Sequence, residues 1–560
     1  MGEGWGEGEM SPHLIPPSPQ SPPARGGEYL VYMSENHKIA RAATTIGMGT
    51  FLSRILGFLR DMVIAHFFGA GMAADAFFVA FRLPNLWRRL VGEGSLTISF
   101  IPVYTEYLTQ RSEEETREVT HIAFTIAGVI LLILTILGIL FSPILIRIIA
   151  PGWFTQYPEK FGLTVTLNQI IFPYLFFMGL FALCMGILNS YRHFFAPAIA
   201  PIFLNISIIV SVFLFYHAFK IPVMTLALGV LAGGVIQFFF QIPFLWKRGI
   251  TFRFNFNFRN PAIKRIGLLM IPGLIGTGVY QLNVFIDTIF ASFLPSGSVS
   301  YLFFADRLME FPLGIFAIAI GMASLPSLSG LASQGKMEEL KETLSFTFRL
   351  VSFISVPAMV GLIALKTPII SLLFQRGLFD YSATEKTAIA LLFYSVGLWA
   401  IAGSRTIVPA FYSLQDTWTP LKIALICLAA NVLLNGIFIF FTPLKHAGLA
   451  LATSLSSTLN LILLFWKLNS KFGKIDMRKN IHSLLRNVLC SLPMGLAAYL
   501  ICSIGNWSAT GNGAAKVLLL FVGIIIGVGI YFVASYWMKN EEMLFLLKML
   551  RRQKRGQATF

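Results

Sequence analysis

Apolar runs long enough to cross a membrane recur along almost the whole chain of 560 residues. An α-helix needs about 20 apolar residues to span the hydrocarbon core, and about fourteen runs of this kind can be counted. They lie at 40–66, 72–104, 119–149, 162–190, 198–217, 222–246, 262–293, 298–328, 344–365, 386–412, 419–441, 446–467, 483–503 and 514–537. Only 12% of the residues are charged, against about 25% in soluble domains. The chain is therefore predicted to be an all-α polytopic membrane protein.

The net charge of +17 is concentrated in the connections between apolar runs. Basic residues gather between the sixth and seventh spans (247–265), after the twelfth span (467–479) and in the tail (548–555), whereas connections of the opposite parity, such as 294–300 and 503–513, contain almost none. Cytoplasmic loops carry such an excess of lysine and arginine, so an even number of spans predicts that both termini are cytoplasmic. No nucleic-acid motif accompanies the charge, and no nucleic-acid partner is expected.

An internal repeat divides the chain. The segment DMVIAHFFGAGMAADAFFV (61–79) aligns without gaps with DTIFASFLPSGSVSYLFFA (287–305), so that Asp61 meets Asp287. Transporters are often built from such repeated bundles. The predicted organisation is a disordered extension (1–37), an N-lobe of six spans (38–250), a C-lobe of six spans (251–468), two further spans (469–540) and a basic cytoplasmic tail (541–560). Whether residues 1–32 belong to the natural protein stays open, because Met33 begins a stretch typical of a natural start.

Charged residues inside the spans indicate a polar path between the lobes. Each costs about 2.5–3.5 kcal/mol at the bilayer centre on insertion scales. In ADAFFVAFRLPNLWRRLVGEG (74–94) the helical spacing places Asp75, Arg82, Arg89 and Glu93 on one stripe, with Arg88 about 100° away. Spans 1 and 8 add SRILGFLRD (53–61) and FFADRLMEFP (303–312). Guanidinium groups in a cavity attract anions and suit phosphate in particular, although Arg88 and Arg89 can instead snorkel to the interface.

A second polar group is predicted in spans 7, 11 and 12. It comprises Asp287, the pair Asn431 and Asn435 on one helix face, and Thr453. Carboxylate, amide and hydroxyl oxygens could bind a hard cation such as Na⁺, but hydrogen bonding between helices is an equally simple explanation. The cysteines and histidines show no metal-ligand spacing, so no other metal and no cofactor is expected.

Four motifs resemble the MurJ/MviN family of lipid II flippases, in the multidrug/oligosaccharidyl-lipid/polysaccharide exporter superfamily. They are SRILGFLRD (53–61), FGAGMAADAFFVAFRLPNLWRRLVGEG (68–94), FASFLPSGSVSYLFFADRLMEFPLG (290–314) and PLKHAGLALA (443–452). The resemblance implies a bacterial inner-membrane protein that moves undecaprenyl-pyrophosphate-linked disaccharide-pentapeptide to the outer leaflet by alternating access. It implies two lobes around a central cationic cavity, and a lipid-tail groove at spans 13 and 14. The cavity residues taken from resemblance and spacing together are Arg54, Arg60, Asp75, Arg88, Arg89, Glu93, Asp306, Arg307 and Glu310.

Several alternatives stay open at this stage. The runner-up is another exporter of the same superfamily, either a cation-coupled drug exporter or an exporter of another polyprenyl-lipid-linked oligosaccharide. A drug exporter would favour an acidic or aromatic cavity, and an enzyme would need a nucleophile–base or metal motif that the sequence lacks. Coupling to Na⁺, to H⁺ or to the membrane potential is undecided, as are the resting conformation and the choice between Arg88 and Arg89. A monomer is expected.

Overall fold

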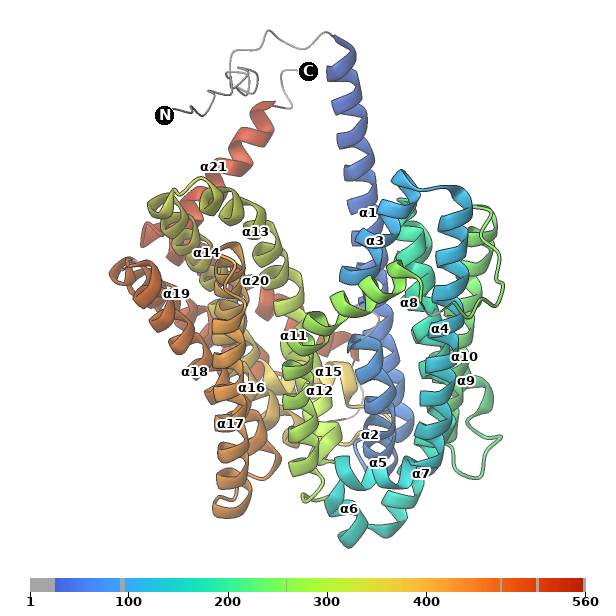
Figure 1. Cartoon of the computed structure of the whole chain (residues 1–560). Helices are drawn as coiled ribbons and strands as arrows, with labels where there is room; N and C mark the ends of the chain where they lie inside the picture. Colours follow the sequence, from blue (N-terminus) through green and yellow to red (C-terminus); the bar gives the residue numbers. More distant parts are fainter. Residues whose placement is uncertain (1–25, 91–95, 258, 474–475, 510–512, 557–560) are drawn as a thin grey trace, which may run out of the picture.

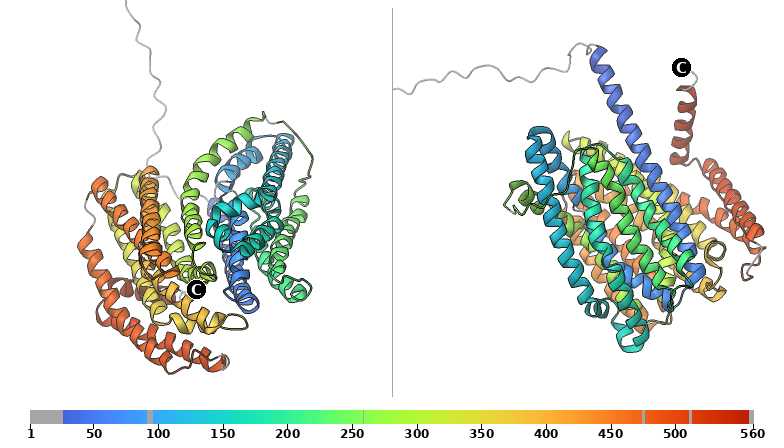
Figure 2. Two further views of the ribbon diagram at one scale, coloured as in Figure 1. Left: turned by 90° about the horizontal axis from the view of Figure 1, so that it is seen from below. Right: turned by 90° about the vertical axis from the view of Figure 1, so that its right-hand side faces the viewer.

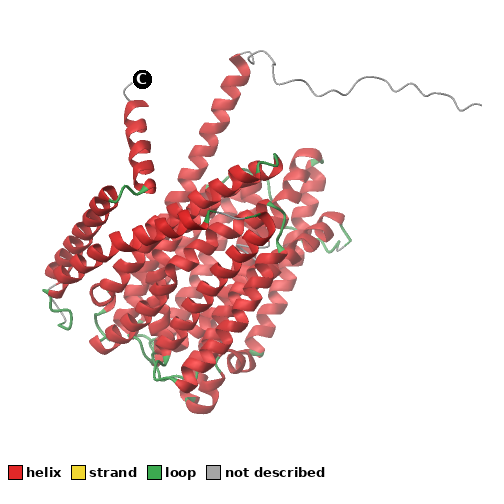
Figure 3. Ribbon diagram, turned by 90° about the vertical axis from the view of Figure 1, so that its left-hand side faces the viewer, coloured by secondary structure: helices red, strands yellow, loops and turns green. Residues whose placement is uncertain are grey.

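The computed structural model describes residues 26–90, 96–257, 259–473, 476–509 and 513–556. The described residues form helices joined by loops and turns, with no strand among them (Figure 3). The fold therefore agrees with the all-α membrane protein that the sequence predicts. Long apolar helices are the form in which a chain can satisfy its backbone hydrogen bonds inside lipid.

The N-lobe is a bundle whose long helices run roughly side by side (Figure 1). It contains α1 (Gly26–Phe68), α2 (Met72–Trp87), α3 (Leu96–Gln110), α4 (Glu113–Leu140), α7 (Pro158–Ile171), α8 (Tyr174–Ser190), α9 (Phe195–Phe215) and α10 (Met224–Trp246), with the short helices α5 (Ser142–Ile149) and α6 (Pro151–Gln156). Helix α9 packs against α1 and α10, and α2 packs against α7.

The C-lobe repeats this plan on the other side of the molecule. It contains α11 (Pro261–Ala291), α12 (Ser298–Pro312), the π-helix η2 (Leu313–Ala317), α13 (Ile318–Ser333), α14 (Met337–Ala364), α15 (Lys366–Phe374), α16 (Tyr381–Ser413), α17 (Trp418–Phe441) and α18 (His446–Phe472). Helix α16 packs against α18 and α14. The last helices are α19 (Met477–Ser503) and α20 (Gly513–Trp537), which pack on each other, and α21 (Glu541–Gly556).

Eleven helices in the described residues are long and apolar enough to cross a membrane. They fall on predicted spans 3–6 and 8–14. Predicted spans 1 and 7 coincide with α1 and α11. Predicted span 2 is interrupted: α2 ends at Trp87, residues 88–90 form a π-helical turn, and α3 begins at Leu96. The exact number of fourteen spans thus stays a prediction.

Both described ends of the chain lie at one end of the helical body. Helices α1 and α21 project from it on the same side (Figures 1 and 2), which we call the terminal end. Helix α1 already begins at Gly26, so residues 26–37 are helical where the sequence indicated disorder, and the rest of that extension lies outside the described residues. Helix α21 extends to Gly556, so most of the predicted basic tail is helical as well.

The internal repeat is visible in the way two helices begin. Gly71 caps α2 and Gly297 caps α12, and these are two positions that the sequence alignment pairs. Helix α11 connects the lobes, since it packs against α17 of the C-lobe and α3 of the N-lobe. Its residue Arg265 also pairs with Glu106 of α3 at 2.7 Å.

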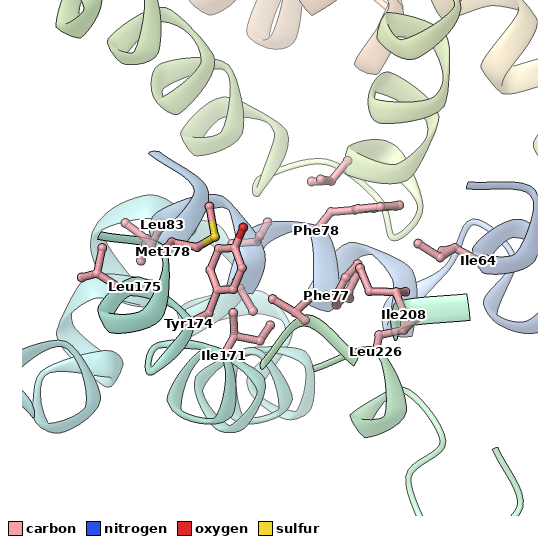
Figure 4. Packing of buried hydrophobic residues seen from close by; sticks show 14 of the residues in the cluster. Ile64, Phe77, Phe78, Leu83, Ile171, Tyr174, Leu175, Met178, Ile208 and Leu226 are labelled. Atoms are coloured by element: carbon pink, nitrogen blue, oxygen red, sulfur yellow. The ribbon is translucent and has the colours of Figure 1, made fainter. Parts of the chain in front are cut away.

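Close apolar packing holds α2 in place. Phe77 is buried with Ile64, Tyr174 and other side chains of α1, α7 and α8 (Figure 4). Phe78 faces the other lobe, where its ring stacks on Phe303 of α12 at a centroid distance of 3.8 Å. Stacked aromatic pairs of this kind add about 0.5–1.5 kcal/mol beyond the burial of their area.

A prediction concerns the contact between α16 and α18. A Cβ added at Gly397 would lie 2.7 Å from the Cα of Ser454, which is backbone and cannot move aside. We expect Gly397→Ala to lower stability by about 1–3 kcal/mol, as overpacking does, seen as a lower midpoint of thermal unfolding in detergent. Gly267→Ala, where nothing lies within 4 Å, is the matched control and should not lower the midpoint. Equal effects at both positions would contradict the prediction.

Candidate functional site

A cavity of about 1080 Å³ is lined by helices of the C-lobe and, at the boundary with the N-lobe, by Arg82 of α2. Its described lining comes from α2, α11, α12, α16, α17 and α18, and runs from Ala291 and Val299 to Thr417 and Trp418 at the α16–α17 connection. The charged lining residues are Arg82, Asp287, Asp306, Glu310 and Arg405. Two of the predicted cavity residues, Asp306 and Glu310, therefore face this space, and so do Asp287 and Thr453 of the predicted cation group. With three carboxyl groups against two arginines, the described lining has no excess of positive charge, unlike the cationic cavity that the resemblance implied.

Arg82 is the one described lining residue that the N-lobe contributes. Its guanidinium crosses to α11, where Nη1 donates to the carbonyl oxygen of Val284 at 3.2 Å and to the hydroxyl of Thr288. The helical spacing of the sequence placed Arg82 on the charged stripe, but it was not among the residues chosen for the site. Its place on the stripe between Asp75 and Arg89 was the signal that could have identified it.

Three of the predicted arginines gather where α1 meets α12. The carboxylate of Asp61, fully buried, accepts from Arg60 Nε at 3.0 Å and Nη2 at 2.7 Å, and from Arg307 Nε at 2.9 Å. Arg54 lies about two turns before Asp61, and its guanidinium is in contact with Gly314 of η2. We call Arg54, Arg60, Asp61 and Arg307 the arginine seam. Arg307 is also close enough to Asp306 and Glu310 to interact with their charges.

Asp61 joins the two lobes, and sequence reasoning did not include it in the site. One carboxylate oxygen binds Arg60 of its own helix and the other binds Arg307 of the C-lobe. Arg60 reaches further, since its Nη1 donates to Asn205 of α9 at 3.1 Å. The spacing of seven between Arg54 and Asp61 indicated a shared helix face, but it could not show that Arg307 approaches from the other lobe.

The end of α2 carries Arg88 and Arg89. Arg88 Nε donates to Asn85 of its own helix at 2.9 Å, while Arg89 is close enough to Asp306 and Arg82 to interact with their charges. Both arginines belong to the π-helical turn that follows α2. The structure therefore brings Arg89, which belongs to the helical stripe, within electrostatic reach of the cavity acid Asp306. Glu93 lies outside the described residues.

Asp75 sits at the opposite end from the termini, near the start of α2 and away from the arginine seam. Its fully buried carboxylate accepts from the backbone N–H of Gly297 at 2.7 Å and of Ser300 at 2.8 Å, and from the Ser300 hydroxyl at 2.6 Å. These are free N–H groups in the first turn of α12, so a residue of the N-lobe caps a helix of the C-lobe. Gly297 has φ +95°, a backbone conformation that glycine adopts at little cost.

Lys160 completes this cap. Its ammonium donates to Asp75 at 2.6 Å and to the Ser296 hydroxyl at 3.4 Å, and it lies 4.1 Å from the ring centroid of Trp153. The lysine is 2% exposed, so the pair is sheltered from water. Nothing in the sequence distinguished this lysine from one in a solvated loop, because its hydrogen-bond partners, Asp75 and Ser296, come from two distant segments.

Further bonds between the lobes lie near the same end. Leu378 N–H donates to the carbonyl oxygen of His66 at 2.9 Å, and Gly152 N–H donates to the Ser292 hydroxyl at 3.0 Å. We call this end, sealed by the Asp75 cap and these bonds, the closed end. Figure 1 shows α2, α5, α6 and α12 meeting there, whereas the lobes diverge toward the terminal end.

The predicted cation group does assemble. Asn435 Nδ2 donates to Asp287 at 2.8 Å and to Asn431 Oδ1 at 2.9 Å, and the Thr453 hydroxyl donates to Asp287 at 3.3 Å. Three helices, α11, α17 and α18, thus bring the four side chains together. Two buried atoms of the group, Asn431 Nδ2 and Asn435 Oδ1, have no hydrogen-bond partner among the described residues.

The Asp75 cap generates a prediction about the closed end. Removing one partner of a buried ion pair costs about 3–5 kcal/mol, so Asp75→Ala should separate the lobes there. Spin labels at exposed positions Met72 and Leu378 should report a longer or broader distance distribution. The four native cysteines are buried and should not be labelled.

Glu106→Ala is the control for that experiment, because it removes an exposed ion pair to Arg265 on the other side of the molecule. It should leave the distance between the labels unchanged. An unaltered distribution in Asp75→Ala would show that the cap does not hold the closed end.

Two lobes around a charged cavity that is sealed at one end define a membrane transporter of the alternating-access class. A solved multidrug transporter of the MATE family in an inward-facing conformation shares this fold, with a TM-score of 0.64 at 15% identity over 78% of this chain and 99% of that one. At that identity the likeness concerns the fold alone.

More specific matches identify the family. The family model for the lipid II flippase MurJ matches residues 64–537. The probable lipid II flippase MurJ of Vibrio cholerae is 37% identical over 506 residues, covering 89% of this chain and 95% of that protein. The lipid II flippase MurJ of Burkholderia cenocepacia is 36% identical over 435 residues, covering 77% of this chain and 84% of that protein.

A solved structure of a lipid II flippase MurJ in an inward closed conformation is also similar. It has a TM-score of 0.74 and 29% identity, and covers 89% of this chain and 99% of that one. The chain belongs to the MurJ family, as its four motifs indicated.

Proposed function

We propose that this chain moves lipid II from the cytoplasmic to the outer leaflet of the bacterial inner membrane by alternating access. The observation that carries the proposal is the arginine seam between the lobes of a MurJ-family protein. The rival activity, export of drugs, is supported only at the level of the fold, by transporters that are 15% identical. The MurJ relatives are more than twice as similar in sequence.

Basic loops support the orientation that we propose. The connection between α10 and α11 holds Lys247, Arg248, Arg253 and Arg259, and Lys264 follows in the first turn of α11. This connection lies on the same side as the termini because α10 runs away from the closed end. By the rule that positive loops stay inside, the terminal end faces the cytoplasm. The closed end then faces the periplasm, and this conformation is closed to the outside.

The arginine seam suits the pyrophosphate of the substrate. Guanidinium forks bind phosphate oxygens in pairs, and Arg60 and Arg307 already share the single carboxylate of Asp61. An anion that enters between α1 and α12 would draw Arg54, Arg60 and Arg307 toward itself, so both lobes would close on the same ligand. Arg82 and Arg405 of the cavity lining, together with Arg89 near Asp306, would guide the anion from the cytoplasmic side.

The Asp75 cap supplies the second half of the proposed cycle. Opening to the periplasm would have to break the bonds of Asp75 to α12, which hold the lobes together in this conformation. A ligand shifts such an equilibrium only by the difference in its affinity for the two states. Contacts of the pyrophosphate with both sides of the arginine seam provide that difference.

The function is tested by replacing the arginine seam. Arg54→Ala, Arg60→Ala and Arg307→Ala should each abolish growth of a strain that depends on this protein as its lipid II flippase, while the protein still inserts in the membrane. In vesicles, movement of lipid II should fall at least about tenfold, the effect of losing one charge-assisted bond of roughly 1.5–3 kcal/mol.

Arg265→Ala is the matched control, since that arginine is exposed at the terminal end and should support normal growth. Normal growth of the triple variant at the arginine seam would overturn the proposed phosphate site. Normal levels of lipid II in the outer leaflet after depletion of the protein would overturn the proposed function itself.

Coupling to Na⁺ is proposed for the group around Asp287. Turning the Asn435 amide over, so that its oxygen and nitrogen exchange places, would direct its buried Oδ1, which lacks a partner, toward Asp287 and Asn431. Four side-chain oxygens from three helices could then surround a hard cation, in line with the ligand preference of such ions. An H⁺ carried by Asp287, or the membrane potential acting on the substrate charge, would replace Na⁺ if that ion has no effect.

The coupling proposal has its own measurement. Transport of lipid II in vesicles should rise with Na⁺ in the unaltered protein, and Asp287→Asn should remove this dependence while leaving slow basal movement. Ser456→Ala, at a cavity residue outside the group, should keep the Na⁺ response. A Na⁺ response that survives Asp287→Asn would contradict the proposal.

A further inference from the structure

A second pocket, of about 290 Å³, lies at the terminal end between α14, α19 and the start of α21. It is distant in the fold from the cavity of the candidate functional site and is not used by the proposed transport cycle. Its basic lining residues are Arg349, Arg478, Lys479, His482 and Arg486, and its acidic ones are Asp476, Glu541 and Glu542. A pocket with both signs of charge differs from a simple basic patch.

A buried ion pair forms the floor of this pocket. Arg349 Nε donates to Glu542 Oε1 at 2.8 Å, and the Ser483 hydroxyl donates to the same oxygen at 3.2 Å. Arg349 and Glu542 are 6% and 1% exposed. The pair ties α21 to α14, so the pocket is a built feature of the fold.

Two buried acceptors in the pocket have no partner among the described residues. They are Glu542 Oε2 and Asn540 Oδ1, both on residues that are 1% exposed and line the pocket. The amide of Asn540 is held in place by its bond to Asn487 at 2.7 Å. Buried acceptors without donors are costly, so the pocket is suited to a ligand that brings hydrogen-bond donors.

The opposite wall offers donors. Arg478, His482 and Arg486 follow one another at intervals of four positions along α19 and so lie on one face of that helix. In the described part of the chain, neither Arg478 nor Arg486 forms an ion pair. Their guanidinium groups can therefore bind the phosphate of the same ligand.

An apolar stripe adjoins these basic residues. Ile481, Leu485 and Leu489 are each about half exposed. Ile481 and Leu485 directly precede His482 and Arg486, which places the stripe about 100° around α19 from the basic face. Exposed apolar side chains on a spanning helix face lipid. A phosphate bound to Arg486 would thus place its acyl chains along this stripe.

We propose that the pocket binds the headgroup of a phospholipid that carries a primary ammonium, as phosphatidylethanolamine does. Arg478 and Arg486 hold the phosphate, and the ammonium donates to Glu542 Oε2 and Asn540 Oδ1. An anionic headgroup such as that of phosphatidylglycerol can donate from its hydroxyl groups, but it brings no positive charge to the carboxylates of Glu541 and Glu542. A trimethylated headgroup would have no N–H to donate.

The test uses the full chain, purified in detergent, and native mass spectrometry of lipid binding. Phosphatidylethanolamine is compared with its N-monomethyl and N,N-dimethyl forms and with phosphatidylcholine, all with the same acyl chains. Affinity should fall along this series, and phosphatidylcholine should bind about tenfold more weakly or worse, since charge-assisted hydrogen bonds are lost. Soluble phosphoethanolamine separates the contribution of the headgroup from that of the acyl chains and should bind detectably but weakly.

Two double variants test whether the lipid binds in this pocket. Arg478→Gln with Arg486→Gln should reduce phosphatidylethanolamine binding at least about tenfold and should remove its stabilisation of thermal unfolding. Both residues lie at the surface of α19 and form no ion pair in the described part of the chain, so the variant should fold. Lys247→Gln with Arg253→Gln removes two exposed charges from another loop at the same end and should change nothing.

Two results would overturn the proposal. Equal binding along the methylated series would show that the ammonium is not recognised. Stronger binding of phosphatidylglycerol than of phosphatidylethanolamine, lost in the α19 variant, would make the pocket a site for anionic lipid. The readout is lipid binding, so it is independent of whether the chain moves lipid II.

Discussion

The conformation of this protein depends on one carboxylate that caps a helix belonging to the other lobe. Asp75 accepts two backbone N–H groups of α12, and Lys160 neutralises it. Burying a lone carboxylate would be prohibitively costly, and the free N–H groups of a helix start need acceptors. The carboxylate and the N–H groups can bond to each other only while the lobes are together. The cap therefore stabilises the closed state relative to a state in which this end is open.

The arginine seam differs from the Asp75 cap in the way its charges are balanced. Asp61 is shared by Arg60 and Arg307, and the carboxyl groups of Asp306 and Glu310 are also close enough to interact with Arg307. Charged groups are costly in a membrane, and a phosphate-bearing ligand that binds here, as we propose, would offset part of that cost. The Asp75 cap is satisfied by groups of the protein alone, whereas the arginine seam is proposed to gain a further partner from the substrate.

The internal repeat explains how one repeated position can serve two purposes. Asp61 and Asp287 occupy equivalent places in the two aligned segments. In the N-lobe the acid faces arginines, and in the C-lobe it faces amide and hydroxyl groups. The first environment suits the binding of an anion by neighbouring cations, and the second suits the binding of a cation by oxygens.

The sequence by itself determined the membrane class, the positions of most spans, the repeat and the family, because apolar length, periodicity and motifs are local properties. Motifs and local spacing also selected Arg54, Arg60 and the residues around Asp287. Only the tertiary structure decided that Asp75 belongs to the closed end, that Lys160 neutralises it, and that α2 ends in a π-turn. The contacts at the closed end and at the arginine seam depend on which side chains meet across two lobes that are far apart in the sequence, and no local pattern encodes such a meeting.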